Sequence, residues 1–157
     1  MKPHKLSIYS MLAAIALTLA AIPAASHAVD TVKAKPVKVK KAHPKQKVII
    51  QVSDNDPKKW NLALNNAQNV QEDLGKKNVA IEIVAYGPGL GMLKLDSEAG
   101  NRVKDALENG VKVVACENTM MKQKLTRADM LPNLGYAKAG VVELAQKQSQ
   151  GYAYIRP

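Results

Sequence analysis

The chain contains a single cysteine, Cys116, at the point where an apolar segment gives way to a polar one. Cys116 ends the run "VKVVAC" and is followed by Glu117, Asn118 and Thr119. The thiolate form of a cysteine is a nucleophile that can accept sulfur and pass it on. A free cysteine is also among the residue types most often buried as a small apolar side chain. Both interpretations of Cys116 stay open at this stage.

Other common chemistries lack their residues after position 47. All three histidines, His4, His27 and His43, come before that position, which excludes a Cys-His or Ser-His pair and a histidine-based metal site. One cysteine forms neither an internal disulfide nor a CxxC pair. The carboxylates near the predicted strand ends do not follow the spacing of a cation-binding loop. We therefore expect no metal ion and no cofactor.

A glycine-rich stretch, "YGPGLGMLKLD", begins at Tyr86. Closely spaced glycines allow backbone amides to approach a phosphate. This spacing does not match GxGxxG, no GK[ST] follows it, and Pro88 removes one donor. We expect a tight connection from a strand to a helix, with Tyr86 and Gly87 shaping a small pocket.

The scaffold for these residues is predicted by strand patterns that alternate with helix patterns. Apolar strands are indicated by "KVIIQVSD", "VAIEIVAY", "VKVVAC" and "YAYI". A first helix is predicted from the cap at Asp56 to the stop at Gly75, and a second one is predicted to be capped by Asp96 or Ser97. A short turn with a capping box is expected at 126–129, and a last helix at about 141–150.

This alternation predicts an α/β protein with three layers, α/β/α, around a mostly parallel sheet of four to five strands. The possible fifth strand would lie in the 131–140 loop. Ligands of open parallel sheets bind beyond the carboxyl ends of the strands. Asn55, Tyr86, Cys116 and Asn118 all follow or end a predicted strand. They are therefore the candidate site residues.

The first 28 residues have the pattern of an export signal. Lys2 and Lys5 precede an apolar run at 11–22, and Ser26 and Ala28 are the small residues of a signal peptidase site. The apolar run is shorter than the ~20 residues that span a membrane. We predict a signal peptide at 1–28, cleavage after Ala28, and a location in a bacterial periplasm.

Positive charge is concentrated in residues 29–47, which contain seven Lys and one Asp. The domain predicted at 48–157 is nearly neutral, with fourteen basic and twelve acidic residues. The 29–47 segment has no aromatic residue, which predicts a disordered linker. It is expected to act either as a solvated tether or as an attachment to an anionic envelope surface. Nucleic acid is not an expected partner of an exported chain.

A family resemblance rests on three stretches of the domain and its ending: "KVIIQVSDNDPKKWNLALNNAQNV", "IEIVAYGPGLGML", "GVKVVACENTM" and "GVVELAQKQSQGYAYIRP". Together they resemble the exported branch of the DsrE/DsrF-like superfamily. The resemblance runs from Lys47 to Pro157. It implies a compact α/β/α fold and assembly as trimers or hexamers. In the cytoplasmic branches it implies sulfur relay as a persulfide on a cysteine after the third strand, the place that Cys116 occupies. Some relatives carry C-x-x-C at this turn, where this chain has Thr119 in the fourth position.

The first hypothesis of function is a sulfur (persulfide) carrier with Cys116 as the acceptor. Asn118 and the backbone after it, at Thr119, would donate hydrogen bonds to the sulfur, and Tyr86 with Gly87 would shape the pocket. The partner would be a sulfur-donor protein or a small persulfide.

The second hypothesis is a noncatalytic, oligomeric, exported binding module that holds a small polar ligand at Asn55, Tyr86 and Asn118. Self-association is expected under either hypothesis, because apolar residues that a monomer would have difficulty hiding fall in predicted loops. These residues are Met92, Leu93, Leu95, Met120 and Met121.

Overall fold

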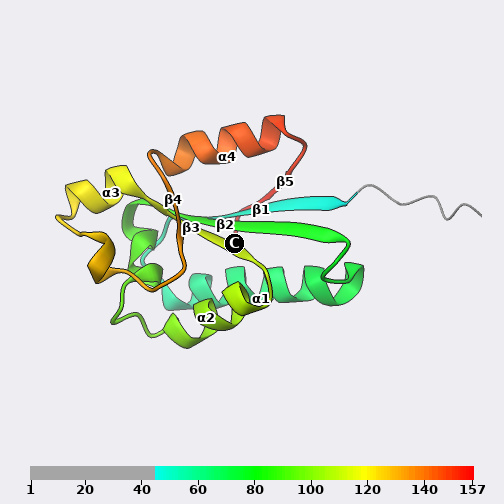
Figure 1. The fold of residues 1–157 in the computed structure, drawn as a ribbon, viewed down its shortest axis with the longest axis horizontal. Coiled ribbons are helices and arrows are strands. Elements are labelled where there is room, and N and C mark those ends of the chain that lie inside the picture. Colours follow the sequence, from blue (N-terminus) through cyan, green and yellow to red (C-terminus); the bar gives the residue numbers. More distant parts are fainter. Residues whose placement is uncertain (1–44) are drawn as a thin grey trace, which may run out of the picture. The chain divides into compact units, whose positions relative to one another are not determined.

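Five parallel strands form one sheet in the computed structural model, which describes residues 45–157 (Figure 1). The strands are β1 (Gln46–Val52), β2 (Val79–Ala85), β3 (Lys112–Cys116), β4 (Gly135–Ala137) and β5 (Ala153–Ile155), in the order β4-β3-β2-β1-β5. The predicted α/β class is confirmed, and the short fifth strand lies in the 131–140 loop as expected. The predicted signal peptide, and the predicted linker up to residue 44, lie outside the described residues. Gln46 and Lys47, predicted as linker, belong to β1.

The first helix, α1 (Pro57–Leu74), begins and ends where the sequence predicts. The Asp56 carboxylate accepts a hydrogen bond from the Lys58 amide at 2.9 Å, and Pro57 occupies the first turn. Gly75 ends the helix with a φ of 82°, a left-handed value that glycine adopts without strain.

The second helix, α2 (Gly100–Glu108), begins later than predicted, and no side chain caps it. Ser97 accepts a hydrogen bond from the Ala99 amide, but this bond lies in the turn before the helix. Residues 94–100 instead form two successive turns, in which the Ser97 amide donates to the Lys94 carbonyl oxygen and the Gly100 amide to the Ser97 carbonyl oxygen. Next to these turns, backbone hydrogen bonds tie Leu95 to Asp129 and Leu131 to Leu93. The glycine-rich stretch forms the 3₁₀ helix η1 (Gly87–Leu93), which provides the expected tight connection.

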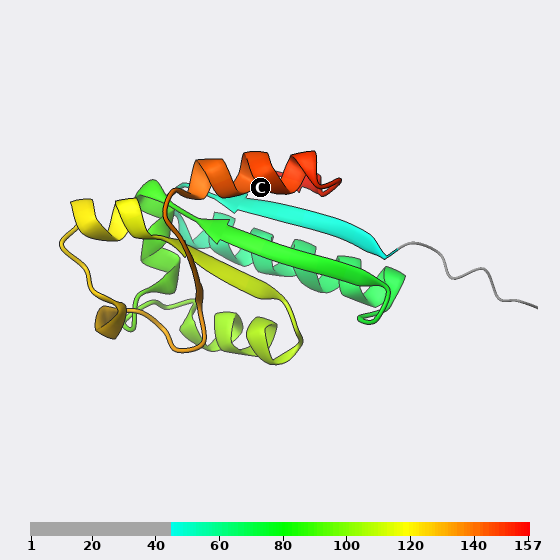
Figure 2. The same ribbon diagram turned by 45° about the horizontal axis from the view of Figure 1, so that its top comes forward.

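Helices α1 and α2 cover one face of the sheet, and α4 (Gly140–Ser149) covers the other (Figure 2). Parallel crossovers are right-handed, so helices change face when the direction of winding reverses. The chain moves from β1 to β3 in one direction and returns from β4 to β5 in the other. The larger core lies under α1 and α2, and a smaller one of Ile49, Val84, Val114 and Leu144 lies under α4. None of the helices described here is long and apolar enough to cross a membrane.

Only part of the apolar set that suggested self-association is exposed. Met92, Leu93 and Met120 are buried in the larger core, whereas Leu95 is 59% exposed and Met121 is 70% exposed. Their placement in the core follows from η1 and α3 (Glu117–Lys122), which turn these side chains inward where the sequence suggested loops. The oligomeric state itself stays a prediction.

Candidate functional site

Cys116 is the last residue of β3, at the carboxyl edge of the sheet, and it is only 4% exposed. Side chains alternate along a strand, so Cys116 shares the α4 face with Val114. The backbone turns directly from Cys116 into α3, which makes Cys116 the N-cap residue of that helix. The first residue of α4, Gly140, donates its amide hydrogen to the Cys116 Sγ at 3.2 Å. The sulfur therefore lies at the start of two helices.

The start of α4 has no capping side chain of its own. Its N-cap residue is Ala139, and the first amides of a helix have no acceptor within the helix. The Cys116 sulfur, from a different element, takes that acceptor role for the Gly140 amide. The thiol can in turn donate to the Lys138 carbonyl oxygen, 4.0 Å away, which also accepts from the Asn118 amide at 3.0 Å. The segment 138–140 thus contacts both the Cys116 sulfur and the Asn118 amide.

Thr119 connects the sulfur to the segment after β2. Its hydroxyl oxygen accepts a hydrogen bond from the Gly87 amide at 2.9 Å. Gly87 has a φ of 55°, a left-handed value that aims its amide at Thr119 and favours glycine. The Thr119 hydroxyl in turn lowers the pKa of the Cys116 thiol through a hydrogen bond.

These contacts favour the thiolate form of Cys116. Burial raises the pKa of the Cys116 thiol, but hydrogen bonds from the Thr119 hydroxyl, the Gly140 amide and the amides of Thr119 and Asn118 lower it. The lowering contributions outweigh burial, so the pKa lies below the ordinary value of 9.0. The predicted role of Asn118 and the backbone after it as donors to the sulfur stays a prediction, because the Asn118 amide donates to the Lys138 carbonyl oxygen.

Tyr86 packs against the start of α4 on the same face. A Cβ atom at position 140 would lie 2.9 Å from the Tyr86 Cβ, so only glycine allows this close approach. Tyr86 is half-buried, and burial raises the pKa of its hydroxyl. Gly140 therefore has two functions, since it donates to the sulfur and makes room for Tyr86.

Four of the five predicted ligand-binding residues, Tyr86, Gly87, Asn118 and Thr119, surround Cys116 through these contacts. Asn55 is placed elsewhere, in a pocket of about 260 Å³ next to Trp60 and Gly91.

Asn118 lines a pocket of about 400 Å³ between the 137–139 loop and α4, with Lys138 and Val142. The single pocket suggested for Asn55, Tyr86 and Asn118 is therefore not formed as predicted. A larger pocket of about 650 Å³ lies against α2 and the 131–133 loop, and none of the predicted site residues lines it.

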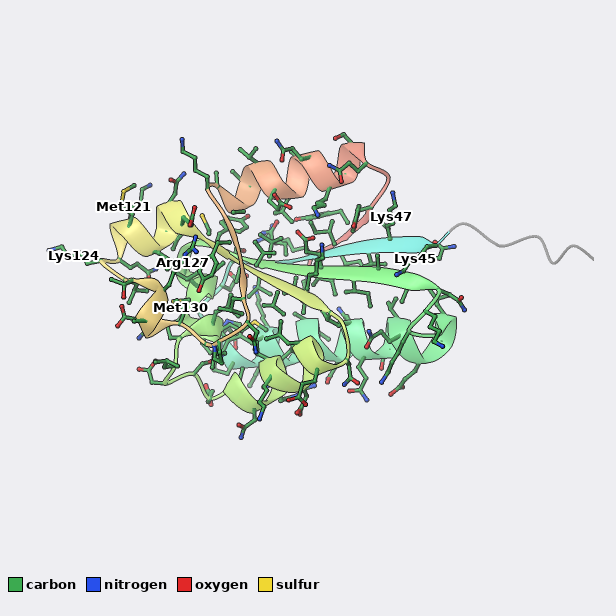
Figure 3. All side chains as sticks on the ribbon, in the orientation of Figure 1. Lys45, Lys47, Met121, Lys124, Arg127 and Met130 are labelled. Atoms are coloured by element: carbon green, nitrogen blue, oxygen red, sulfur yellow. The ribbon has the colours of Figure 1, made fainter. Side chains whose placement is uncertain are left out.

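Beyond Cys116, the segment 117–130 forms a lobe at the carboxyl edge of the sheet. Figure 3 shows Met121, Lys124 and Arg127 on this lobe, at the end of the domain opposite Lys45. Arg127 pairs with the Glu117 carboxylate at 2.7 Å, so the charge next to the cysteine is balanced. The Arg127 guanidinium also lies over the Tyr136 ring, 4.1 Å from its centroid. The predicted capping box at 126–129 is present and closes the lobe.

Sequence reasoning missed three residues that matter on this face. Lys138 precedes α4 and Gly140 begins it, in a stretch with no catalytic pattern, and the only signal was the missing cap residue before "GVVEL". Glu82 is 2% exposed in the middle of β2, and its signal was a lone acidic residue inside an apolar strand. Across residues 45–157, no group of three or more His, Cys, Asp and Glu side chains is placed to hold a metal ion.

Comparisons with known proteins agree with this fold. The model of the DsrE/DsrF-like family matches residues 46–157. A protein of unknown function from Methanobacterium thermoautotrophicum, MTH1491, has a similar solved structure, with 32% sequence identity and a TM-score of 0.68 over 71% of this chain and 99% of that chain. The ychN protein from E. coli has 12% identity and a TM-score of 0.59 over 72% of this chain and 99% of its own, which shows the fold alone.

A conserved protein of unknown function from Bacteroides thetaiotaomicron, BT1422, has 13% identity and a TM-score of 0.58 over 71% of this chain and 95% of that chain. None of the curated proteins matches the sequence. The family match covers all of the sheet and every helix described above. The chain belongs to the DsrE/DsrF-like family.

Proposed function

We propose that the chain is a sulfur carrier that holds sulfane sulfur as a persulfide on Cys116. The family is associated with sulfur relay, and Cys116 is the only cysteine. The observation that carries the proposal is the Gly140 amide, which donates to the buried Cys116 sulfur at 3.2 Å, next to Thr119 and the backbone at Asn118, which also lower the pKa of the thiol. The lowered pKa favours the thiolate, which is the form that attacks.

The proposed step is a transfer without net oxidation. The Cys116 thiolate attacks the outer sulfur of a donor persulfide, R–S–S⁻, and a new S–S bond forms at Sγ. The S–S bond of the donor breaks, and its electron pair leaves on R–S⁻, which takes up a proton from water. Cys116 then carries a persulfide anion, and the amides that faced the thiolate are positioned to face the added negative charge.

Access to the sulfur requires a local opening, because Cys116 is 4% exposed. The backbone of Lys138 and Ala139 separates Sγ from the pocket lined by Asn118 and Val142. Separation of Gly140 from the sulfur would expose Sγ toward that pocket. Local openings of this kind need much less free energy than global unfolding.

The location and the partners are part of the proposal. The pattern of residues 1–28 supports export to the periplasm, and the Lys-rich 29–47 segment suits attraction to an anionic envelope surface. A low-molecular-weight persulfide or a sulfur-donor protein would supply the sulfur. A trimer or hexamer is proposed from the family resemblance.

The burial of Cys116 favours a second candidate, a noncatalytic exported binding module. In that case the sulfur serves only as the acceptor for the first amide of α4, which its 3.2 Å contact with Gly140 allows. Asn118 and the pocket beside Lys138 would then bind a small polar ligand or partner.

Mass spectrometry after incubation with a low-molecular-weight persulfide tests the carrier. The wild type should gain the mass of one sulfur atom on the peptide containing Cys116, and Cys116→Ser should gain none. Titration of the native protein with a thiol reagent provides the second readout. A thiol that reacts only after unfolding, in a wild type that gains no sulfur, would favour the noncatalytic module.

A further inference from the structure

The most unusual group outside the cysteine site is a buried carboxylate in the central strand. Glu82 lies in β2, is 2% exposed, and points to the α4 face. Its Oε2 pairs with Lys147 Nζ at 2.7 Å, while its Oε1 is buried without a hydrogen-bond partner. Burying a carboxylate is unfavourable unless it is paired on both oxygens, and an apolar residue would serve a sheet core better.

Helix α4 brings a second carboxylate to the same cation. Lys147 Nζ lies 3.4 Å from the Glu143 Oε1, one helical turn away, and 5.3 Å from the centroid of the Tyr152 ring. Glu143 and Glu82 thus lie on the same ammonium group, and Glu143 raises the pKa of Glu82. Two carboxylates and one ammonium therefore meet between β2 and α4.

This cluster provides much of the attachment of α4. Among the ten residues of the helix, only Gly140 and Leu144 are buried, and Val141 and Val142 are 61% and 49% exposed. Besides the packing of Leu144 and the contacts of Gly140 with Cys116 and Tyr86, the pair between Lys147 and Glu82 ties the helix to the sheet. The helix is attached at Lys147 and begins at Gly140, about two helical turns away.

We infer that Glu82, Glu143 and Lys147 form a proton-sharing clamp that positions α4, and that the clamp thereby holds the Gly140 amide on the Cys116 sulfur. When the two carboxyls hold one proton between them, they share a hydrogen bond that uses Oε1 of Glu82, and the net charge of the cluster is zero. When that proton is lost, two carboxylates face one ammonium group, and Glu82 repels Glu143 on the helix. The clamp rests on the proposed function, because it makes these three side chains positioning residues for the thiolate.

The protonation behaviour of the cluster agrees with this geometry. Burial raises the pKa of Glu82, against the lowering effect of Lys147 and with a further rise from Glu143. Burial lowers the pKa of Lys147, but the hydrogen bond and charge of Glu82 outweigh it and raise that pKa. Both shifts mean that the cluster holds its protons firmly.

Besides Cys116, the other titratable groups on this face are cations and phenols. Lys112 on β3 lies opposite Glu82 in the strand register, and Lys47 on β1 lies 5.6 Å from the centroid of the Tyr152 ring. Tyr136 of β4 lines the same open pocket as Glu82. These cations moderate the excess negative charge of the deprotonated cluster. Neither replaces Lys147, because Lys112 is exposed and Lys47 is bonded to the Gln150 carbonyl oxygen at 3.0 Å.

The test is the rate of Cys116 alkylation by iodoacetamide as a function of pH, in the full folded protein. Glu82→Gln copies the protonated state, because an amide can accept from Lys147 and donate to Glu143. Lys147→Met removes the cation that both carboxylates share. Lys104→Met is the matched control, since Lys104 forms an exposed pair with Glu108 at 3.9 Å on α2.

Lys147→Met should raise the plateau rate at high pH by about tenfold, the equivalent of one lost hydrogen bond, and should move the half-maximal rate to higher pH. Glu82→Gln should keep the thiol protected and give a plateau below that of the wild type. Lys104→Met should follow the wild type.

The clamp is refuted if all three variants follow the wild type, or if Glu82→Gln opens the site as Lys147→Met does. Melting curves exclude global unfolding as the cause of faster alkylation in a variant. Sulfur uptake is measured separately. A wild type that gains no sulfur would end the carrier proposal while leaving the alkylation comparison of the variants intact.

Discussion

Replacing Cys116 with serine and with alanine separates the two roles of its sulfur, hydrogen-bond acceptor and nucleophile. Serine keeps an oxygen that can accept from the Gly140 amide, 3.2 Å from the sulfur, and donate to the Lys138 carbonyl oxygen. Alanine leaves the first amide of α4 without an acceptor. We therefore expect the two variants to differ in stability and to agree in chemistry.

The magnitude follows from these contacts. A buried donor left unsatisfied costs about 1 to 3 kcal/mol, whereas an exchange of one acceptor for another costs less than about 1 kcal/mol. One kcal/mol corresponds to a shift in Tm of about 4 °C for a domain of this size. Cys116→Ala should therefore lower Tm by about 4 to 12 °C, and Cys116→Ser by clearly less.

Thermal melts and persulfide labelling on the same three proteins provide the assay. Neither variant should take up sulfur, and the wild type should. Equal destabilisation by serine and alanine would show that the contact with Gly140 contributes nothing to stability. Sulfur uptake by Cys116→Ser would show that the reactive group lies elsewhere.

Three further predictions concern the same edge of the sheet. Thr119→Val removes the hydroxyl that donates to the sulfur, so the pH profile of Cys116 alkylation should move to higher pH; an unchanged profile would exclude Thr119 from the site. Because the folded-state pKa of Cys116 is lowered, its contribution to stability should be absent well below that pKa, grow as pH rises toward 9.0, and be complete above it; the Tm difference between wild type and Cys116→Ser, measured across this range, should widen with pH. Gly140→Ala should cost about 1 to 3 kcal/mol by forcing a Cβ against Tyr86, whereas Gly100→Ala, whose Cβ would meet only ordinary contacts, should be tolerated in denaturant titrations.

Much of the fold was predictable because its signals are local. Asp56 and Gly75 mark the ends of α1 through capping and a left-handed backbone, both of which depend on a few neighbouring residues. The apolar runs indicated four strands, since both faces of a parallel sheet are covered. The start of α2 was not predictable from its cap residues, because residues 94–100 form turns next to the 129–131 segment.

The candidate site divides in the same way. The sequence by itself determined that Cys116 ends a strand, that Tyr86 and Gly87 follow the neighbouring one, and that no histidine serves the domain. Only the tertiary structure decided what the sulfur contacts. Gly140 is 24 residues away along the chain, yet its amide is the donor at 3.2 Å.

The same holds for Asn55 and Glu82. The sequence predicted that Asn55 and Tyr86 each follow a strand. It did not predict that Asn55 packs next to Gly91 and Trp60, in a pocket of its own. Glu82 meets its cation at 2.7 Å only because α4 returns across the sheet, 65 residues later in the chain. Residue type and local pattern determine which groups are present; the reversal of winding that puts α4 on the second face determines which of them meet.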